Sequence, residues 1–277
     1  MITKKDIQNF CETYRVLARA DDFIYLLPHQ ALRNWISNYT ITFLSKNMIS
    51  KNYTVIPHGS ATLVFSFDGK GLYSNLFGPA TKSCMVGDQA NQFDMLFIIE
   101  FQPAGLYPFA GINQKELTDH TIPFELINPI LNKLIAEMLY NASNIYQLIT
   151  SLDRLLLSNR HTACPSELSF VTQMIIEDIG NISAKKLSDS VYYSERHLNR
   201  IFNQYLGMNI KTFSRLVRIN KAIRLLHDPQ ISITKTCNLT GFYDLPHFIH
   251  DFKSACGFTP QEYRSNMSDF YTEIAKF

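Results

Sequence analysis

The amino-acid sequence predicts an α+β protein of two domains, the first rich in β-strands and the second all-helical. The chain has 277 residues, roughly twice the length of a typical domain. Runs of β-branched and aromatic residues separated by Gly, Pro and Asp dominate residues 1–125, and helical periodicity replaces them after Pro123. With 46% hydrophobic and 18% charged residues, the composition excludes an intrinsically disordered chain.

The strand signals of the first domain come in three runs. Residues 53–56, 61–67 and 93–101 are rich in β-branched, aromatic and aliphatic side chains, and a cluster containing Pro, Gly or Asp follows each run. Short strands between such turns predict a compact β-sheet domain, either a sandwich or a barrel.

A helical hairpin at residues 128–159 completes the first domain, which spans 1–160. Apolar residues recur at steps of three and four from an Asn-Pro start to Asn141, and Ser143 is predicted to cap the second helix. The hairpin is expected to pack on the sheet or on a partner subunit. Residues 159–165 break the periodicity and are predicted to be the linker.

The second domain, residues 166–277, contains the same unit twice. A short capped helix, a tight turn and a polar-faced second helix occur at 183–205 and again at 232–256, and a long helix at 209–227 joins them. This is the layout of a helix-turn-helix, whose second helix enters the major groove of DNA. The predicted helix caps are Ser166, Ser183, Ser194, Ser232, Asp244 and Thr259.

The second helix of each unit carries side chains of the kinds that read base edges. Arginine bridges O6 and N7 of guanine, and asparagine or glutamine bridges N6 and N7 of adenine. The candidate base-reading residues are Arg196, His197, Asn199, Arg200, Gln204, His247 and His250.

Several motifs in this region match one protein family. Residues 240–244 read Thr-Gly-Phe-Tyr-Asp, Phe248 and Phe252-Lys253 follow, and residues 257–264 read Gly-Phe-Thr-Pro-x-x-Tyr-Arg. The first unit adds Leu187, Ser194, His197-Leu198, Arg200, Phe202, Gly207 and Arg218-Ile219-x-x-Ala222-x-x-Leu225-Leu226. On these motifs, residues 183–264 resemble the DNA-binding domain of the AraC/XylS family of bacterial transcription regulators.

Two positions depart from the family pattern. Pro246 stands where the family usually has a small polar residue, and His250 stands where it usually has arginine. Histidine is a poorer reader of guanine than a bidentate arginine. Because many family members bind strongly through the first recognition helix and weakly through the second, the resemblance implies a larger contribution from Arg200 than from His250.

The resemblance also implies how the two units meet DNA. One long helix holds them so that they enter successive major grooves about 34 Å apart. Basic side chains then contact phosphates, which fixes the register without reading sequence. The candidate phosphate contacts are Lys211, Arg215, Arg218, Lys235 and Lys253.

The first domain resembles, less specifically, the cupin-like or jelly-roll sensor domains of some AraC-type regulators. The resemblance lies in residues 56–59, 77–79, 101–107 and 116–119. It implies that this domain binds a small effector, mediates dimerisation, or does both. Aromatic residues that would line an effector pocket, or alternatively fill the core of the sheet, are Phe65, Phe67, Phe97, Phe101 and Tyr107.

Catalytic and metal-binding patterns are missing from the sequence. No C-x-x-C or H-x-H pair occurs, His58 is predicted to be a turn residue, and the His247/His250 pair lacks a third ligand. No nucleophile elbow, zincin or phosphate-loop motif is present, so we expect no enzyme, metal or cofactor. The competing hypothesis is a small-molecule-binding or enzymatic first domain with an attached DNA-binding module.

The net charge of +2 conceals an uneven distribution. Residues 1–180 hold 13 basic and 16 acidic residues, whereas residues 181–264 hold 12 basic and 6 acidic residues, as expected of a DNA-binding module. The expected partners are double-stranded promoter DNA, RNA polymerase, an unidentified small-molecule effector and a second copy of the chain. No signal peptide or membrane partner is expected, which predicts a location in the bacterial cytoplasm, at the nucleoid.

Overall fold

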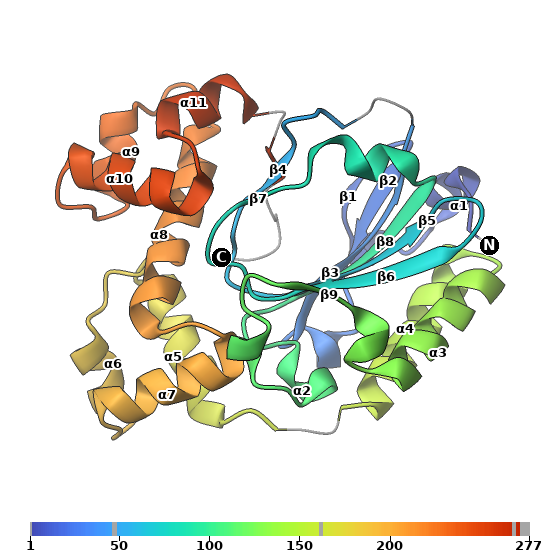
Figure 1. The fold of residues 1–277 in the computed structure, drawn as a ribbon, viewed down its shortest axis with the longest axis horizontal. Helices are drawn as coiled ribbons and strands as arrows, with labels where there is room; N and C mark the ends of the chain where they lie inside the picture. Colours follow the sequence, from blue (N-terminus) through green and yellow to red (C-terminus); the bar gives the residue numbers. More distant parts are fainter. Residues whose placement is uncertain (1, 46–48, 161–162, 268–269, 272–277) are drawn as a thin grey trace.

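A computed structural model describes residues 2–45, 49–160, 163–267 and 270–271 (Figure 1). A β-sheet with a helical hairpin forms the amino-terminal part, and helices form the carboxy-terminal part. The predicted α+β class with two domains is therefore confirmed. The boundary predicted near residues 159–165 stays a prediction, and residues 161–162 of it lie outside the described residues.

Within the described residues, seven strands form one antiparallel sheet in the order β1-β2-β3-β8-β5-β6-β9. A smaller sheet of three strands has the order β10-β4-β7, in which β4 and β7 come from the amino-terminal part of the chain and β10 from residues 270–271. The strands are β1 Val16–Arg19, β2 Phe23–Leu26, β3 Ile36–Phe43, β4 Thr54–Val55, β5 Thr62–Phe67, β6 Leu72–Phe77, β7 Cys84–Met85, β8 Met95–Phe101, β9 Thr121–Pro123 and β10 Phe270–Tyr271.

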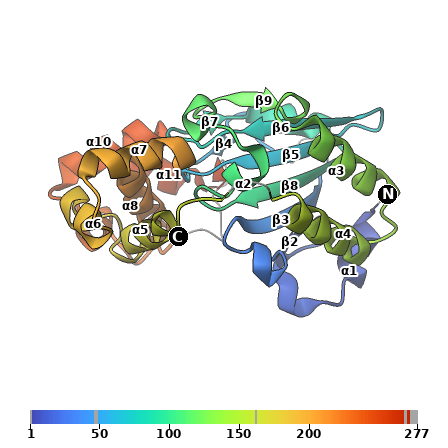
Figure 2. The same cartoon turned by 90° about the horizontal axis from the view of Figure 1, so that it is seen from below.

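The predicted helical hairpin packs on one face of the large sheet (Figure 2). Helix α3, Pro129–Asn141, starts at Asn128, whose side chain accepts from Leu131 N. The second helix, α4, spans Ile145–Ser158. Of the two packing modes that the sequence left open, the structure shows packing on the sheet.

The prediction that Ser143 caps α4 is wrong by one residue. The cap is Asn144, whose side-chain oxygen accepts from Gln147 N at 2.8 Å. The Ser143 hydroxyl donates instead to the Gln147 side chain at 2.7 Å. A local partner for the serine therefore shifts the start of the helix.

A buried ionic cluster ties α4 to the edge of the sheet. Asp153 Oδ2 accepts from Arg15 Nη2 at 2.8 Å, and Asp153 Oδ1 accepts from Tyr39 Oη at 3.0 Å and from His29 N at 3.1 Å. The Arg15 and Asp153 side chains are 9% and 7% exposed. Because each charge is removed from water, the two stabilise the fold only as a pair.

The carboxy-terminal helices have a second hydrophobic core. The predicted caps Ser183, Ser194, Ser232, Asp244 and Thr259 each accept from a backbone N–H. Ser166 is a helix residue rather than a cap, because its hydroxyl donates to Glu167 Oε2. The helices are α5 Ser166–Glu177, α6 Ala184–Ser190, α7 Glu195–Leu206, α8 Ile210–Leu226, α9 Ile233–Leu239, α10 Leu245–Cys256 and α11 Pro260–Ser265; short helices α1 Lys4–Asn9 and α2 Tyr107–Ala110 belong to the first domain.

No helix in the described ranges combines the length and apolar character needed to cross a membrane. Likewise, nowhere in the described part of the chain do three or more His, Cys, Asp or Glu side chains gather closely enough to hold a metal ion.

Candidate nucleic-acid interface

The first helix-turn-helix unit consists of α6 and α7. Ser194 caps α7 by accepting from His197 N at 3.2 Å, and Gly207 ends it in the left-handed conformation at φ 81°. The inward face carries the buried residues Leu198, Ile201, Phe202 and Leu206. Arg196 and Arg200 lie exposed on the opposite face. This amphipathic helix leaves two guanidinium groups available to a groove.

The second unit, α9 and α10, repeats the first with an offset of 50 residues along its recognition helix. Asp244 replaces Ser194 as the cap, and Gly257 at φ 82° replaces Gly207. Equivalent positions on the two helices are His197 and His247, Arg200 and His250, and Phe202 and Phe252. Helix α8 lies between the two units and packs against both (Figure 1).

In each unit, an aromatic residue of the turn packs against a histidine of the recognition helix. The Tyr193 and His197 rings meet edge to face at 4.6 Å between centroids, and the Phe242 and His247 rings do so at 5.6 Å. The same packing in both units fixes the first turn of each recognition helix against its own turn.

The predicted base-reading residues all lie on α7 and α10, but their surroundings differ. Arg200 is exposed, with Nη2 at 3.3 Å from His197 Nδ1. Asn199 is bound internally, because Oδ1 accepts from Ile210 N at 3.1 Å and Nδ2 donates to Glu195 O at 3.0 Å. A base contact by Asn199 would require these bonds to break, so this role stays a prediction. Gln204 is half-buried.

The second recognition helix presents histidines around an acid. Asp251 Oδ2 lies 3.5 Å from His247 Nε2, and its Oδ1 lies 3.6 Å from His250 Nδ1. The His250 side chain is 79% exposed, whereas that of Asp251 is 14% exposed. Asp251 stands at the position equivalent to Ile201 of α7. Because this carboxylate adds a negative charge, α10 has a less positive surface than α7.

The predicted phosphate contacts fall into two groups. Lys211, Lys235 and Lys253 are exposed. Arg215 and Arg218 are half-buried on α8, and the Arg218 guanidinium carbon lies 5.0 Å from the centre of the Phe242 ring. Burial lowers the pKa of Arg218; Asp251 opposes this shift, and Arg215 adds to it.

Of the five aromatic residues predicted to line an effector pocket, all but Tyr107 lie in the core between sheet and helices. Phe65 of β5 pairs with Phe97 of β8, and their rings are 6.5 Å apart. Phe67 contacts Tyr140 of α3, with ring centroids 5.3 Å apart. The remaining two are Phe101, whose ring lies 5.9 Å from that of Phe109, and Tyr107, whose ring lies 4.4 Å from that of Tyr205 of α7. An effector role for these residues stays a prediction.

The residue predicted as a turn histidine is buried. His58 Nδ1 is 2.9 Å from Ser60 Oγ, and its Nε2 is 4.0 Å from Glu100 Oε2. Glu100 also accepts from Thr62 Oγ1 at 2.7 Å. Sequence reasoning missed this polar cluster, because Glu100 comes from a strand about forty residues away.

The sequence also gave no sign that the amino-terminal domain holds the ends of both recognition helices. Thr118 Oγ1 donates to Gly207 O at 2.7 Å, at the end of α7. At the end of α10, Ser83 N donates to Ala255 O and Ser83 Oγ donates to Cys256 O, both at 2.8 Å. The last carbonyls of a helix have no partner within it. The first domain therefore supplies donors to both helix ends.

The first domain also contacts the helix between the two units. Asn220 Nδ2 of α8 donates to Pro57 O at 2.9 Å, and the bond is buried. Gly59 lies against Leu216 and Phe213 of the same helix, at 3.3 and 3.4 Å from the position a β-carbon would take. All three elements of the candidate interface, α7, α8 and α10, are thus in contact with the first domain.

Two family models match this chain. A model described as a helix-turn-helix domain matches residues 187–266, and one described as a domain of unknown function, DUF6597, matches residues 25–123. The Msm operon regulatory protein of Streptococcus mutans is 32% identical over 89 residues, which cover 32% of this chain and 31% of that protein. The chain therefore spans about a third of the length of this relative.

Two solved structures show a partial likeness. A transcriptional regulator from Chromobacterium violaceum, described by its AraC-type DNA-binding domain, is 29% identical with a TM-score of 0.34, over 36% of this chain and 89% of that one. ToxT from Vibrio cholerae O395 is 12% identical with a TM-score of 0.40, over 84% of this chain and 98% of that one.

Proposed function

Because the carboxy-terminal domain of this chain is an AraC-type helix-turn-helix domain, we propose that the protein is a transcription regulator that binds promoter DNA through α7 and α10. The observation that carries this proposal is the duplicated, capped recognition helix with exposed polar residues, within residues 181–264, which hold 12 basic and 6 acidic residues. Helix-turn-helix units place such helices in the major groove.

Selection of bound sequences from random DNA tests this proposal. The full chain is incubated with a random duplex library, and recovered DNA is sequenced after several rounds. We expect a site with two half-sites about one helical turn apart. Recovery of no common sequence would contradict sequence-specific binding.

Lys211→Ala is expected to weaken binding to all DNA sequences by a similar factor. Lys211 lies exposed at the start of α8, where an ammonium group contacts phosphate rather than bases. The slope of log affinity against log salt should flatten by about one unit. Fluorescence anisotropy over a salt series measures both quantities. A change in which sequence is preferred would show instead that Lys211 reads bases.

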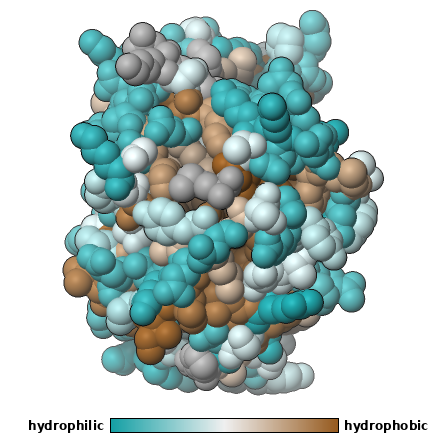
Figure 3. Space-filling model, turned by 90° about the vertical axis from the view of Figure 1, so that its right-hand side faces the viewer, coloured by the Kyte–Doolittle hydropathy of each residue, from teal (hydrophilic) through white to brown (hydrophobic). Residues whose placement is uncertain are grey.

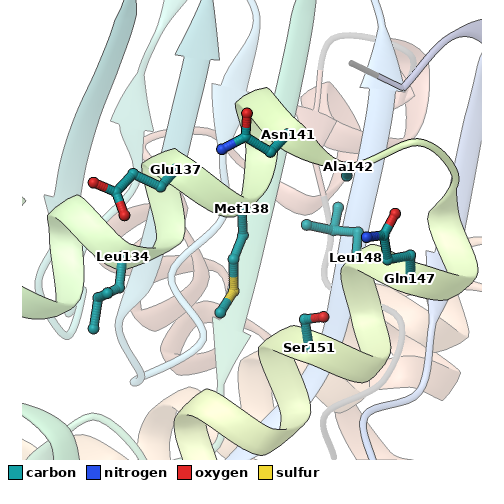
Figure 4. Close-up of a pocket in the computed structure, with 8 residues that line it drawn as sticks. All are labelled: Leu134, Glu137, Met138, Asn141, Ala142, Gln147, Leu148 and Ser151. Carbon is teal, nitrogen blue, oxygen red and sulfur yellow. The ribbon is translucent and has the colours of Figure 1, made fainter.

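We further propose that the first domain dimerises through the outer face of α3 and α4. Between the two helices lies a groove of about 210 Å³, into which Met138 and Ser151 point (Figure 4). Leu134 also lines it, and Ile130 of α3 is 71% exposed. Figure 3 views the molecule from the side on which these helices lie. It shows an area of hydrophobic surface, in brown, bordered by hydrophilic residues, in teal. A second copy would cover these apolar side chains.

Fragment 1–160 is expected to dimerise by itself. Sedimentation equilibrium measures its mass, and Leu134→Lys should shift the equilibrium toward monomer, because a charge would be buried in the interface. Met85→Lys is the matched control, since Met85 is 63% exposed on β7, away from α3 and α4 (Figure 1). A fragment that remains monomeric at high concentration would contradict this interface.

The remaining parts of the proposal concern control of the regulator. A small effector would act by binding one arrangement of the two domains better than another. The contacts of the first domain with α7, α8 and α10 are the structural route for such an effect. At a promoter in the bacterial cytoplasm, RNA polymerase is the proposed protein partner.

A further inference from the structure

The two loops that hold the recognition helices are bound to each other. Loop 78–83 follows β6, and loop 113–120 precedes β9, the strand that pairs with β6. Asp119 Oδ1 accepts from Thr81 N at 2.7 Å, and Asp119 Oδ2 accepts from Thr81 Oγ1 at 2.6 Å. Asp119 N donates to Pro79 O at 3.1 Å. One carboxylate thus joins the loop that reaches α7 to the loop that reaches α10.

The backbone around this carboxylate is tightly constrained. Asp119 has a φ of 58°, a left-handed conformation that aspartate tolerates better than most residues. Gly78 N donates to His120 O at 2.9 Å. The Gly78 Cα lies so close to the Leu117 carbonyl that no side chain would fit there. The two loops therefore form a single unit, which we term the bracket.

The bracket reaches equivalent points of the two helix-turn-helix units. Thr118 lies next to Asp119 and bonds Gly207, which ends α7. Ser83 lies two residues after Thr81 and bonds the last carbonyls of α10, beside Gly257. Both contacts involve a hydroxyl of the first domain and the carboxyl end of a recognition helix, the end opposite the capped turn that enters the groove.

We propose that Asp119 is a positioning residue that fixes the two recognition helices relative to each other and so sets the half-site spacing accepted on DNA. This inference rests on the proposed binding of DNA by both units. With the two loops joined, movement of α10 relative to α7 must break a bracket contact. Without the carboxylate, only backbone bonds join the two loops, so each loop moves more readily with its own helix and the two helices adjust more easily to a changed spacing.

The test compares Asp119→Ala with the full wild-type chain on selected DNA whose half-sites are separated by the preferred spacing or by one base pair more or less. In the wild type, altered spacing weakens binding. In Asp119→Ala, the ratio between preferred and altered spacing should fall about threefold to tenfold, as expected for loss of solvent-exposed hydrogen bonds. Affinity for DNA with only the first half-site should stay unchanged.

Two further variants separate positioning from general damage. Asp119→Asn keeps a side-chain acceptor and tolerates the left-handed conformation, so its spacing ratio should lie between those of the wild type and Asp119→Ala. Asp68→Ala is the matched control. Asp68 accepts from Lys70 N and Gly71 N, both at 2.9 Å, in the turn between β5 and β6. Its loss should leave the spacing ratio unchanged.

Hydrogen exchange provides a readout that needs no DNA. The Ser83 amide donates to Ala255 O, so Asp119→Ala should accelerate its exchange, whereas Asp68→Ala should not. Unchanged exchange and an unchanged spacing ratio in Asp119→Ala would overturn the inference while leaving the proposed function intact. A wild-type chain that binds no DNA selectively would refute the proposed function, and the inference with it.

Discussion

Asp153→Ala is expected to lower the free energy of unfolding of the amino-terminal domain by about 3–5 kcal/mol, the cost of leaving a buried charge without its partner. Asp153 accepts from Arg15, Tyr39 and the backbone of His29. Burial raises the pKa of Tyr39 well above its ordinary value, and Asp153 adds to this, so the phenol remains a donor. Alanine would leave the Arg15 guanidinium buried and uncompensated.

Denaturant unfolding followed by tryptophan fluorescence measures this loss. The chain has a single tryptophan, Trp35, which lies in the amino-terminal domain and therefore reports on it. Glu137→Ala is the control, because the Lys133–Glu137 pair is solvent-exposed at 3.9 Å and should contribute less than about 0.5 kcal/mol. Arg15→Met combined with Asp153→Leu should recover only part of the loss, because it removes the unpaired charge but still leaves Tyr39 Oη and His29 N without their acceptor. A loss below about 1 kcal/mol in Asp153→Ala would contradict burial of the pair.

The fold was predictable where local interactions decide it. The caps Ser194, Asp244 and Thr259 bond to amides three residues away, so sequence spacing alone identifies them. Ser143 and Ser166 misled the prediction because Gln147 and Glu167 offer their hydroxyls a different local partner. The sequence reasoning singled out none of β1, β2 and β3, whose pairing is set by contacts across the sheet.

In the candidate site too, the sequence predicted what depends on local helical periodicity and not what depends on contacts between distant residues. Helical periodicity places Arg196 and Arg200 on the solvent side of α7. Periodicity does not show that Asn199 bonds the start of α8, because Ile210 lies on the next helix. Nor does it show the bonds from Thr118 and Ser83, which join residues far apart in the chain. Contacts between domains depend on the tertiary arrangement, for which the sequence has no periodic signal.

Arg200→Ala is expected to reduce affinity for the selected DNA by about 1–3 kcal/mol and to relax the preference at one base position. The Arg200 side chain is exposed, and its Nη2 lies 3.3 Å from Nδ1 of His197, a ring that Tyr193 braces. A guanidinium oriented in this way loses less conformational freedom when it binds the two acceptors of guanine. Anisotropy titration and repeated sequence selection with the variant measure the two effects.

Two comparisons identify the origin of this loss. Lys70→Ala removes the same charge from the turn between β5 and β6, where the side chain is exposed outside the proposed interfaces, so any effect it shares with Arg200→Ala is due to net charge. Arg200→Lys keeps the charge on α7 but lacks the fork that binds guanine at two points. If Arg200 reads a base, Arg200→Lys should lose the base preference almost as fully as Arg200→Ala. If Arg200 contacts a phosphate instead, Arg200→Lys should keep most of the affinity that Arg200→Ala loses, and both variants should keep the base preference of the wild type. If Arg200→Ala leaves the base preference unaltered, Arg200 contacts the phosphate backbone of DNA, and other residues of α7 read the sequence.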